Sequence, residues 1–192
     1  MKGARPLAVE EITQVLDNCI ETREECLVTI GLNLGLSVSE LVSLKWQDVL
    51  QGTQVFPVLY LDRNRTKGKK PRAVPINDRV ASAVLKLHTN QLKQGEPTTP
   101  EAFLFPGRNK GHLGARQVNR LLYRLFAEAG LTGKLSSHSL RKSFGTLLND
   151  NGASLPVIQE LLGHADISTT RKYIGVGMES MTKAVNVLAG AY

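Results

Sequence analysis

Four residues in the C-terminal part of the chain have the types and spacing needed for phosphoryl transfer. His138 and Arg141 lie three residues apart at the start of a predicted helix, so they project from the same face. The positive end of a helix favours an anion, and a guanidinium can bind two oxygens of one phosphate. His164 follows a glycine and is placed to donate to the same phosphate. Tyr173 offers a hydroxyl that can attack phosphorus and hold it covalently.

Two further groups of basic residues suit an anionic partner. Six of the ten residues from 63 to 72 are basic, in a turn-like segment: Arg63, Arg65, Lys67, Lys69, Lys70 and Arg72. In a predicted helix over 114–129, Arg116, Arg120 and Arg124 recur every four residues, opposite an apolar face. Either group is also compatible with an ordinary solvated surface, but both suit contact with DNA phosphates.

The composition agrees with a DNA-binding protein and excludes several other classes. The 192 residues carry 24 Lys and Arg against 17 Asp and Glu, which gives a net charge of +7. With 42% hydrophobic residues the chain can form a core, whereas 5% aromatic residues are too few for a single-strand stacking surface. It has no apolar run of the roughly 18 residues that span a membrane, and no signal peptide. We therefore expect a soluble, cytoplasmic protein that binds duplex DNA.

The elements that must position these residues are mostly helical. Apolar periodicity predicts helices over about 12–20, 24–34, 114–129, 138–150, 155–162, 167–174 and 178–188. Asn77 is a good N-cap for a further helix, and Ser37 with Glu40 has the S-x-x-E form of a capping box. Apolar and β-branched runs over 54–76 predict an antiparallel hairpin or a three-stranded sheet. The expected fold class is α+β, mostly helical with a small antiparallel β-sheet.

Several side chains are assigned to the interior by this periodicity. Ile20 continues the apolar stripe of the first helix, and Leu92 that of the helix after Asn77. Cys19 and Cys26 have no histidine nearby that would complete a metal site. We expect them to be buried thiols in a reducing compartment.

Three segments resemble the tyrosine recombinases, also called the phage integrase family. The run SSHSLRKSFGTLLNDNGASLPVIQELLGHADISTTRKYIGV is similar to that family's H-x-L-R…LLGH…T…Y signature. Upstream, GLSVSELVSLKWQDV resembles its G-L-R-x-S-E-L-x-x-L-x-W-x-D segment, and RTKGKKPRAVPI resembles the hairpin that carries its catalytic lysine. The match runs in the expected order from about Leu7 to Ile174.

The resemblance implies a catalytic domain that cleaves and rejoins DNA through a 3′-phosphotyrosine, with no metal and no nucleotide cofactor. Tyr173 matches the nucleophile and Arg141 the second phosphate-binding arginine. His138 and His164 match the two histidines of the signature. Lys67 matches the hairpin lysine, the general acid toward the 5′-hydroxyl, although Lys69 and Lys70 are close enough in sequence to compete for that role.

The resemblance also implies partners. Double-stranded DNA is the expected ligand, bound by a homotetramer on two sites. The expected DNA contacts are basic residues: Arg63, Arg65, Lys69, Lys70, Arg72, Arg116, Arg120, Arg124, Lys142 and Arg171. The apolar stripe of a tail helix within 175–192 is expected either to dock on a neighbouring protomer or to pack on its own domain.

One departure from the family bears on catalysis. Ser37 stands where the family has its first phosphate-binding arginine, and losing such a donor costs about 10²–10³ in rate. A natural variant that uses Lys45, Arg63 or Arg65 instead is one explanation. An inactivated relative and an engineered mutant are the others. The capping box explains how serine is tolerated there for folding, but a hydroxyl replaces no positive charge.

The whole chain, 1–192, is expected to be a single catalytic domain, with the family's N-terminal core-binding domain absent or removed. It resembles either an excised fragment or the short members such as the fimbrial-switch invertases. Site-specific recombination or integration is the main functional hypothesis, for a protein encoded by a bacterium, a phage or another mobile element. The alternative is a DNA-binding protein that keeps the fold but is catalytically impaired by Ser37. An unrelated helix-turn-helix regulator would leave the ordered His138 to Tyr173 set unexplained, and a metal-dependent nuclease is disfavoured because no carboxylate cluster accompanies the histidines.

Overall fold

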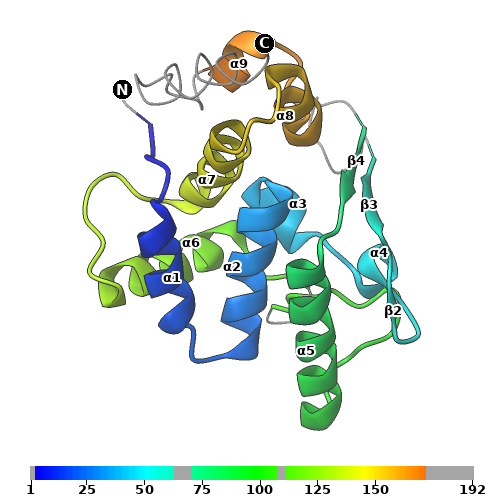
Figure 1. Cartoon of the computed structure of the whole chain (residues 1–192). Helices are drawn as coiled ribbons and strands as arrows, with labels where there is room; N and C mark the ends of the chain where they lie inside the picture. Colours follow the sequence, from blue (N-terminus) through cyan, green and yellow to red (C-terminus); the bar gives the residue numbers. More distant parts are fainter. Residues whose placement is uncertain (1–2, 63–70, 108–110, 172–192) are drawn as a thin grey trace.

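The computed structural model describes residues 3–62, 71–107 and 111–171 and confirms the α+β fold (Figure 1). The helices are α1 (Val9–Asp17), α2 (Thr22–Leu34), α3 (Val38–Val42), α4 (Trp46–Val49), α5 (Asp78–Gln94), α6 (Ala115–Glu128), α7 (Ser137–Asp150), α8 (Leu155–Leu162) and α9 (Ile167–Arg171). The strands are β1 (Leu50–Gln51), β2 (Gln54–Val55), β3 (Val58–Leu61) and β4 (Arg72–Pro75). The tail helix predicted over 178–188 and the end of the one predicted over 167–174 lie outside the described residues.

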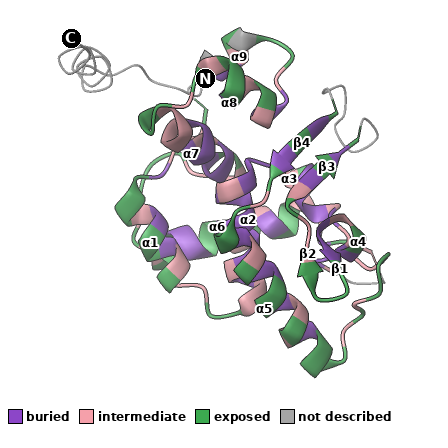
Figure 2. Ribbon diagram, turned by 45° about the vertical axis from the view of Figure 1, so that its right-hand side comes forward, coloured by how far each residue is buried: buried purple, intermediate pink, exposed green. Residues whose placement is uncertain are grey.

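Helix α2 lies at the centre of the molecule and packs against α5, α7, α3 and α1 (Figures 1 and 2). From Cys26 to Leu32 every residue is buried, as expected for a helix surrounded by others. Helices α7, α8 and α9 gather at one end of the molecule, and the β3–β4 hairpin reaches the same end beside α8. This end holds the C-terminal residues predicted to act on phosphate.

The strands form two separate two-stranded antiparallel sheets, β1 with β2 and β3 with β4, so the hairpin is confirmed and the three-stranded sheet is not. In the β3–β4 hairpin Leu59 faces Val74 and Leu61 faces Arg72. Because side chains alternate along a strand, Val74 and Arg72 project to the same buried face, whereas Ala73 is exposed. The register therefore turns the Arg72 side chain into the protein.

The segment that precedes α1 is fastened to α7 and to the loop before it. The backbone N–H of Arg5 donates to the carbonyl of Lys134 at 2.8 Å, and its guanidinium donates to the carbonyl of Thr132 and to Glu11. The backbone N–H of Leu7 donates to the hydroxyl of Ser143 on α7, also at 2.8 Å. The start of the described chain thus supports the helix that carries His138 and Arg141.

Three local predictions need correction. The first helix ends at Asp17 and not near residue 20, so Ile20 lies in the turn before α2 and is 86% exposed. Cys19, in the same turn, is only partly buried, whereas Cys26 in α2 is buried as predicted, and both are free thiols. Leu92 is 56% exposed because the buried face of α5 continues from Leu87 to Gln91, and Leu92 lies one position beyond it on the solvent side.

Candidate active site

Four segments of the chain meet around a cavity of about 240 Å³. Its lining residues come from the start of α3, from α7, from the turn after α8 and from α9: Leu36, Ser37, Val38, Ser137, His138, Arg141, His164 and Thr169. The fold therefore brings His138, Arg141 and His164 together with Ser37, the position of the missing arginine. Tyr173 and Lys67 lie outside the described residues, so their roles stay predictions.

Helix α7 supplies His138 and Arg141 from its first turns. Its N-cap Ser136 accepts a hydrogen bond from the N–H of His138 at 3.2 Å, and the hydroxyl of Ser139 accepts one from the N–H of Ser136 at 3.1 Å. These caps fix where the helix begins and therefore which face carries the two residues. His138 is exposed, whereas Arg141 is 3% exposed.

The guanidinium of Arg141 is held mainly by backbone carbonyls. It donates through Nη1 to Gly35 and through Nη2 to Leu162, and Glu40 Oε2 lies 3.8 Å from Nη1. Gly35 ends α2 with a φ of 58°, and a Cβ there would lie 2.3 Å from the ring of Phe144. Only glycine fits that position, which places its carbonyl against Arg141.

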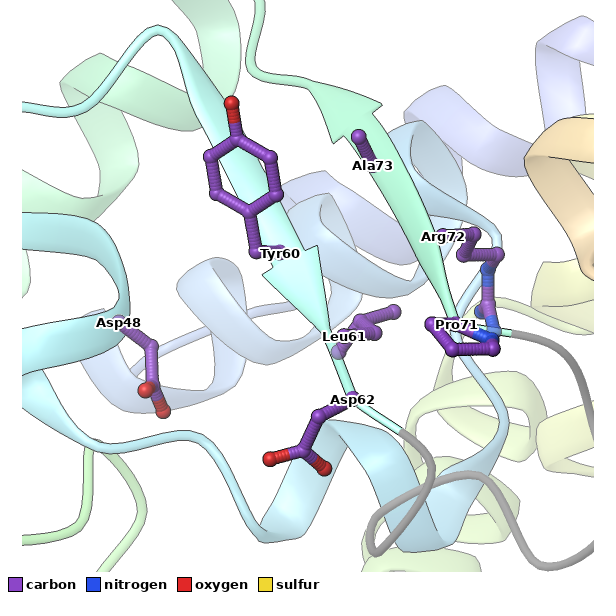
Figure 3. A pocket seen from close by; sticks show the side chains of 7 residues that line it. All are labelled: Asp48, Tyr60, Leu61, Asp62, Pro71, Arg72 and Ala73. Atoms are coloured by element: carbon purple, nitrogen blue, oxygen red, sulfur yellow. The ribbon is translucent and has the colours of Figure 1, made fainter.

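Arg72, predicted to contact DNA, is instead part of a buried ion pair, so that prediction is wrong. Its Nη1 and Nη2 donate to the two carboxylate oxygens of Glu40 at 2.8 and 3.1 Å, and both side chains are fully buried. Its Nε donates to the carbonyl of Leu161 at 2.9 Å. The physical reason is the strand register, which points Arg72 inward. Figure 3 shows it turned away from Asp48 and Asp62.

Glu40 also receives two hydrogen bonds from Ser37. The backbone N–H and the hydroxyl of Ser37 both donate to Oε2 at 2.7 Å, and the predicted capping box of α3 is confirmed. Burial alone would raise the pKa of Glu40, but the hydrogen bonds and charge of Arg72, with the bonds from Ser37, lower it to about 2. Glu40 is therefore an anion that binds Arg72 on one side and Ser37, a residue of the cavity wall, on the other.

Of the three cations considered as replacements for the missing arginine, the structure describes only Lys45. Lys45 is not the replacement for the missing arginine, because its Nζ lies over the ring of Phe103, 5.5 Å from the centroid, and it does not line the cavity. Arg63 and Arg65 lie outside the described residues. Arg72 and Ser37 both bind Glu40, and this carboxylate largely neutralises the charge of Arg72.

His164 is held from three directions. Its backbone N–H donates to the carbonyl of Gln159 at 3.1 Å, and the side-chain amide of Gln159 donates to the carbonyl of His164 at 3.0 Å. Its Nδ1 lies 2.9 Å from the hydroxyl of Thr170 on α9. The preceding Gly163 has a φ of 64°, and a Cβ there would lie 3.0 Å from Arg72. The glycine before His164 is therefore required both by its backbone and by its neighbour.

The sequence alone indicated no role in the active site for Gly35, Glu40 or Thr170. The capping box singled out Glu40, but only for folding, and the threonine stands in the T…Y part of the quoted signature. Nothing local in the sequence marks the carbonyl of Gly35 as the partner of Arg141, because the two residues are 106 positions apart.

The basic residues of α6 do not form one uniform ridge. Arg116 and Arg120 are exposed, and among the described residues no carboxylate forms an ion pair with either. Arg124, whose side chain is 42% exposed, forms ion pairs with Glu24 on α2 and with Glu128 one turn along α6, so two carboxylates already engage the charge that was predicted to contact DNA. Lys142 is half-buried on α7, and Arg171 is the last residue of α9.

A second hollow, of about 500 Å³, lies on the outer side of the hairpin (Figure 3). It is lined by Asp48, Tyr60, Leu61, Asp62, Pro71, Arg72 and Ala73. Of the predicted catalytic residues that the structure describes, none lines it. Over residues 3–62, 71–107 and 111–171, no three His, Cys, Asp or Glu side chains lie close enough together to hold a metal ion, and no helix has the length and hydrophobicity of a membrane span.

Known proteins share both the sequence pattern and the fold. The family model described as "Phage integrase family" matches residues 5–179. The tyrosine recombinase XerC of Syntrophus aciditrophicus is 36% identical over 188 residues, which cover 91% of this chain and 57% of XerC. XerD of Rickettsia bellii is 34% identical over 189 residues, covering 93% of this chain and 62% of XerD. The chain thus spans about three fifths of these curated relatives.

Solved structures agree. The crystal structure of XerA recombinase has a TM-score of 0.80 at 24% identity, covering 99% of this chain and 67% of XerA. The XerH site-specific recombinase bound to its difH substrate, a pre-cleavage complex, has a TM-score of 0.74 at 26% identity, covering 98% of this chain and 55% of XerH. With a family match over nearly its whole length, this chain belongs to the phage integrase family of tyrosine recombinases.

Proposed function

We propose that this chain is the catalytic part of a site-specific recombinase that cleaves and rejoins duplex DNA through a 3′-phosphotyrosine. The observation that carries the proposal is the single cavity lined by His138, Arg141 and His164, which come from α7 and from the turn after α8. The relatives named tyrosine recombinases, and the XerH structure with its DNA substrate, support the same activity.

In the proposed reaction the hydroxyl of Tyr173 attacks the scissile phosphorus, and the bond from phosphorus to the 5′-oxygen breaks. The phenol proton passes to His138, and Lys67 supplies a proton to the departing 5′-oxygen. Arg141 and His164 donate hydrogen bonds to the non-bridging oxygens, where negative charge increases in the transition state. Attack by a 5′-hydroxyl of another strand reverses these steps and releases Tyr173.

Arg141 suits this role because backbone carbonyls orient its guanidinium toward the cavity that it lines. Its two described hydrogen bonds go to the carbonyls of Gly35 and Leu162, which orient the guanidinium but carry no net charge. Glu40 lies 3.8 Å away and is already bound through both oxygens by Arg72. A phosphate in the cavity would therefore meet a fixed cation that loses little entropy on binding.

The proposed duplex contacts are the basic residues that remain once Arg72 and Arg124 are set aside: Arg63, Arg65, Lys69, Lys70, Arg116, Arg120, Lys142 and Arg171. We further propose that residues 1–192 form one catalytic domain, which in a longer protein follows a core-binding domain. Four copies would assemble on two DNA sites, with the tail over 175–192 docking on the neighbouring protomer.

A nicked duplex whose cleaved end diffuses away tests the activity, because the cleaved product cannot be religated. We expect a denaturation-resistant adduct between protein and DNA that is absent from Tyr173→Phe. Arg141→Lys and His164→Ala should form it more slowly at unchanged DNA affinity. If the wild-type chain forms no adduct, or if Tyr173→Phe forms it equally well, the proposal is wrong.

Ser37 provides a second test of the same site. We expect Ser37→Arg to raise the single-turnover cleavage rate by about 10²–10³, since it restores one donor to the transition state. DNA affinity should change little, and Ser37→Ala is the matched control that removes the hydroxyl without adding charge. Wild-type cleavage that is already fast and gains nothing from the arginine would mean that another cation occupies this role.

A further inference from the structure

The hydroxyl of Thr170 is buried against His164. Thr170 lies on α9 and its residue is 0% exposed, so its hydroxyl has no contact with solvent. The single hydrogen bond that the structure gives this hydroxyl, among the described residues, joins Oγ1 to Nδ1 of His164 at 2.9 Å. His164 lines the cavity, so this hydrogen bond joins Thr170 to a residue of the cavity wall.

This contact constrains where the imidazole proton lies. If Nδ1 carried a proton, as it does in one neutral tautomer and in the imidazolium, the Thr170 oxygen would accept it. The hydroxyl hydrogen of Thr170 would then have no acceptor among the described residues, and burying an unpaired donor is costly. If Thr170 donates to Nδ1, its hydrogen is paired and the imidazole proton must sit on Nε2.

We propose that Thr170 is a positioning residue that donates to Nδ1 of His164 and so holds that ring as the neutral tautomer with its proton on Nε2. The nitrogen that remains for the cavity is then a hydrogen-bond donor. Only the role of this donor, binding a non-bridging phosphate oxygen, rests on the proposed function.

The surroundings of His164 favour the same arrangement. The two hydrogen bonds with Gln159 fix its backbone at both ends, so the ring can turn only about its own side-chain bonds. Charged groups near this end of α8 include the guanidiniums of Arg72 and Arg141, which donate to Leu161 and Leu162, and the carboxylates of Glu40, Glu160 and Asp166. Because both signs of charge are present, it is the hydrogen bond with Thr170 that selects the tautomer.

Nitrogen-15 NMR of the DNA-free protein tests the proton position without reference to catalysis. We expect His164 to show a protonated Nε2 and an unprotonated, hydrogen-bonded Nδ1 near neutral pH. In Thr170→Val the Nδ1 resonance should move to that of a lone pair without a hydrogen bond, whereas Thr170→Ser should keep the wild-type pattern. A protonated Nδ1 in the wild-type protein would overturn the proposal, even if neither variant folds.

The cleavage assay on the nicked duplex tests the consequence. We expect Thr170→Val to slow cleavage by saturating protein about two- to tenfold, the value of one neutral hydrogen bond, with DNA affinity unchanged. Thr170→Ser should restore the rate, and Thr170→Val should cost nothing further in a His164→Ala background. Equal losses in the valine and serine variants, or full additivity with His164→Ala, would contradict a role through His164. Absence of an adduct in the wild-type chain would refute the proposed function and leave the tautomer result standing.

Discussion

Arginines are concentrated in two regions: the ionic cluster of Glu40, Arg72 and Arg141, and the outer face of α6. In both regions, the arginines that pair with carboxylates are not the ones that sequence spacing would indicate. In the cluster, Arg72 is bound by both oxygens of Glu40, whereas Arg141 rests on two carbonyls. On α6, Arg124 is paired with Glu24 and Glu128. The carboxylates that the fold places beside each arginine therefore differ between the two regions, and spacing along the sequence does not predict them.

The largest expected difference between the two regions is in stability. We expect Arg72→Met to lower the free energy of unfolding by about 3–5 kcal/mol, because it leaves Glu40 buried without its partner. Arg124→Met should cost less, about 1–3 kcal/mol, because the Arg124 side chain is 42% exposed, although Glu24, at 5% exposed, loses its partner. Urea unfolding followed by circular dichroism measures both. Similar losses in the two variants would remove the distinction.

The pH dependence of stability separates the regions next. The pKa of Glu40 is lowered from 4.5 to about 2 in the folded protein, so its contribution is present above pH 4.5. It is lost progressively as the pH falls from about 4.5 to about 2. Urea unfolding across that range should show a slope that Glu40→Gln reduces. An unchanged slope in this variant would mean that other carboxylates govern acid unfolding.

Two glycines with the same backbone form a matched pair for the contact with Arg72. Gly163 and Gly130 have φ values of 64° and 69°, so alanine should cost each about 1–2 kcal/mol. At Gly163 the added methyl would also lie 3.0 Å from Arg72, whereas nothing lies within 4 Å at Gly130. We expect Gly163→Ala to unfold at lower urea than Gly130→Ala and to slow cleavage. Equal urea midpoints would show that the Arg72 side chain moves away from the added methyl group at little cost in stability.

The smallest effects are expected in DNA binding at α6. Arg116→Ala and Arg120→Ala should each reduce the slope of log affinity against log salt by about one phosphate contact. Arg124→Ala should leave the slope unchanged, because Glu24 and Glu128 already engage its charge. Fluorescence anisotropy at several salt concentrations gives the three slopes. A reduction in Arg124→Ala like the other two would indicate that the ion pairs open on DNA.

The sequence predicted what is local and missed what is not. The caps at Ser37 and Asn77 were predictable, because each depends on neighbours within four residues. The gathering of His138, Arg141 and His164 was predictable from their residue types and order, which also carry the resemblance to the family. The fates of Arg72 and Arg124 were not, because their partners Glu40 and Glu24 lie 32 and 100 positions away.

The fastening of the N-terminal segment has a consequence for the order of folding. Arg5 and Leu7 donate to Thr132 and Ser143, which follow 127 and 136 positions later in the chain. During synthesis Arg5 can pair with Glu11 at once, but its contact with Thr132 and that of Leu7 with Ser143 must wait until α7 has emerged, and closing so long a loop carries a large entropy cost. We therefore expect the start of the chain to dock on α7, the helix that bears His138 and Arg141, in a late step of folding.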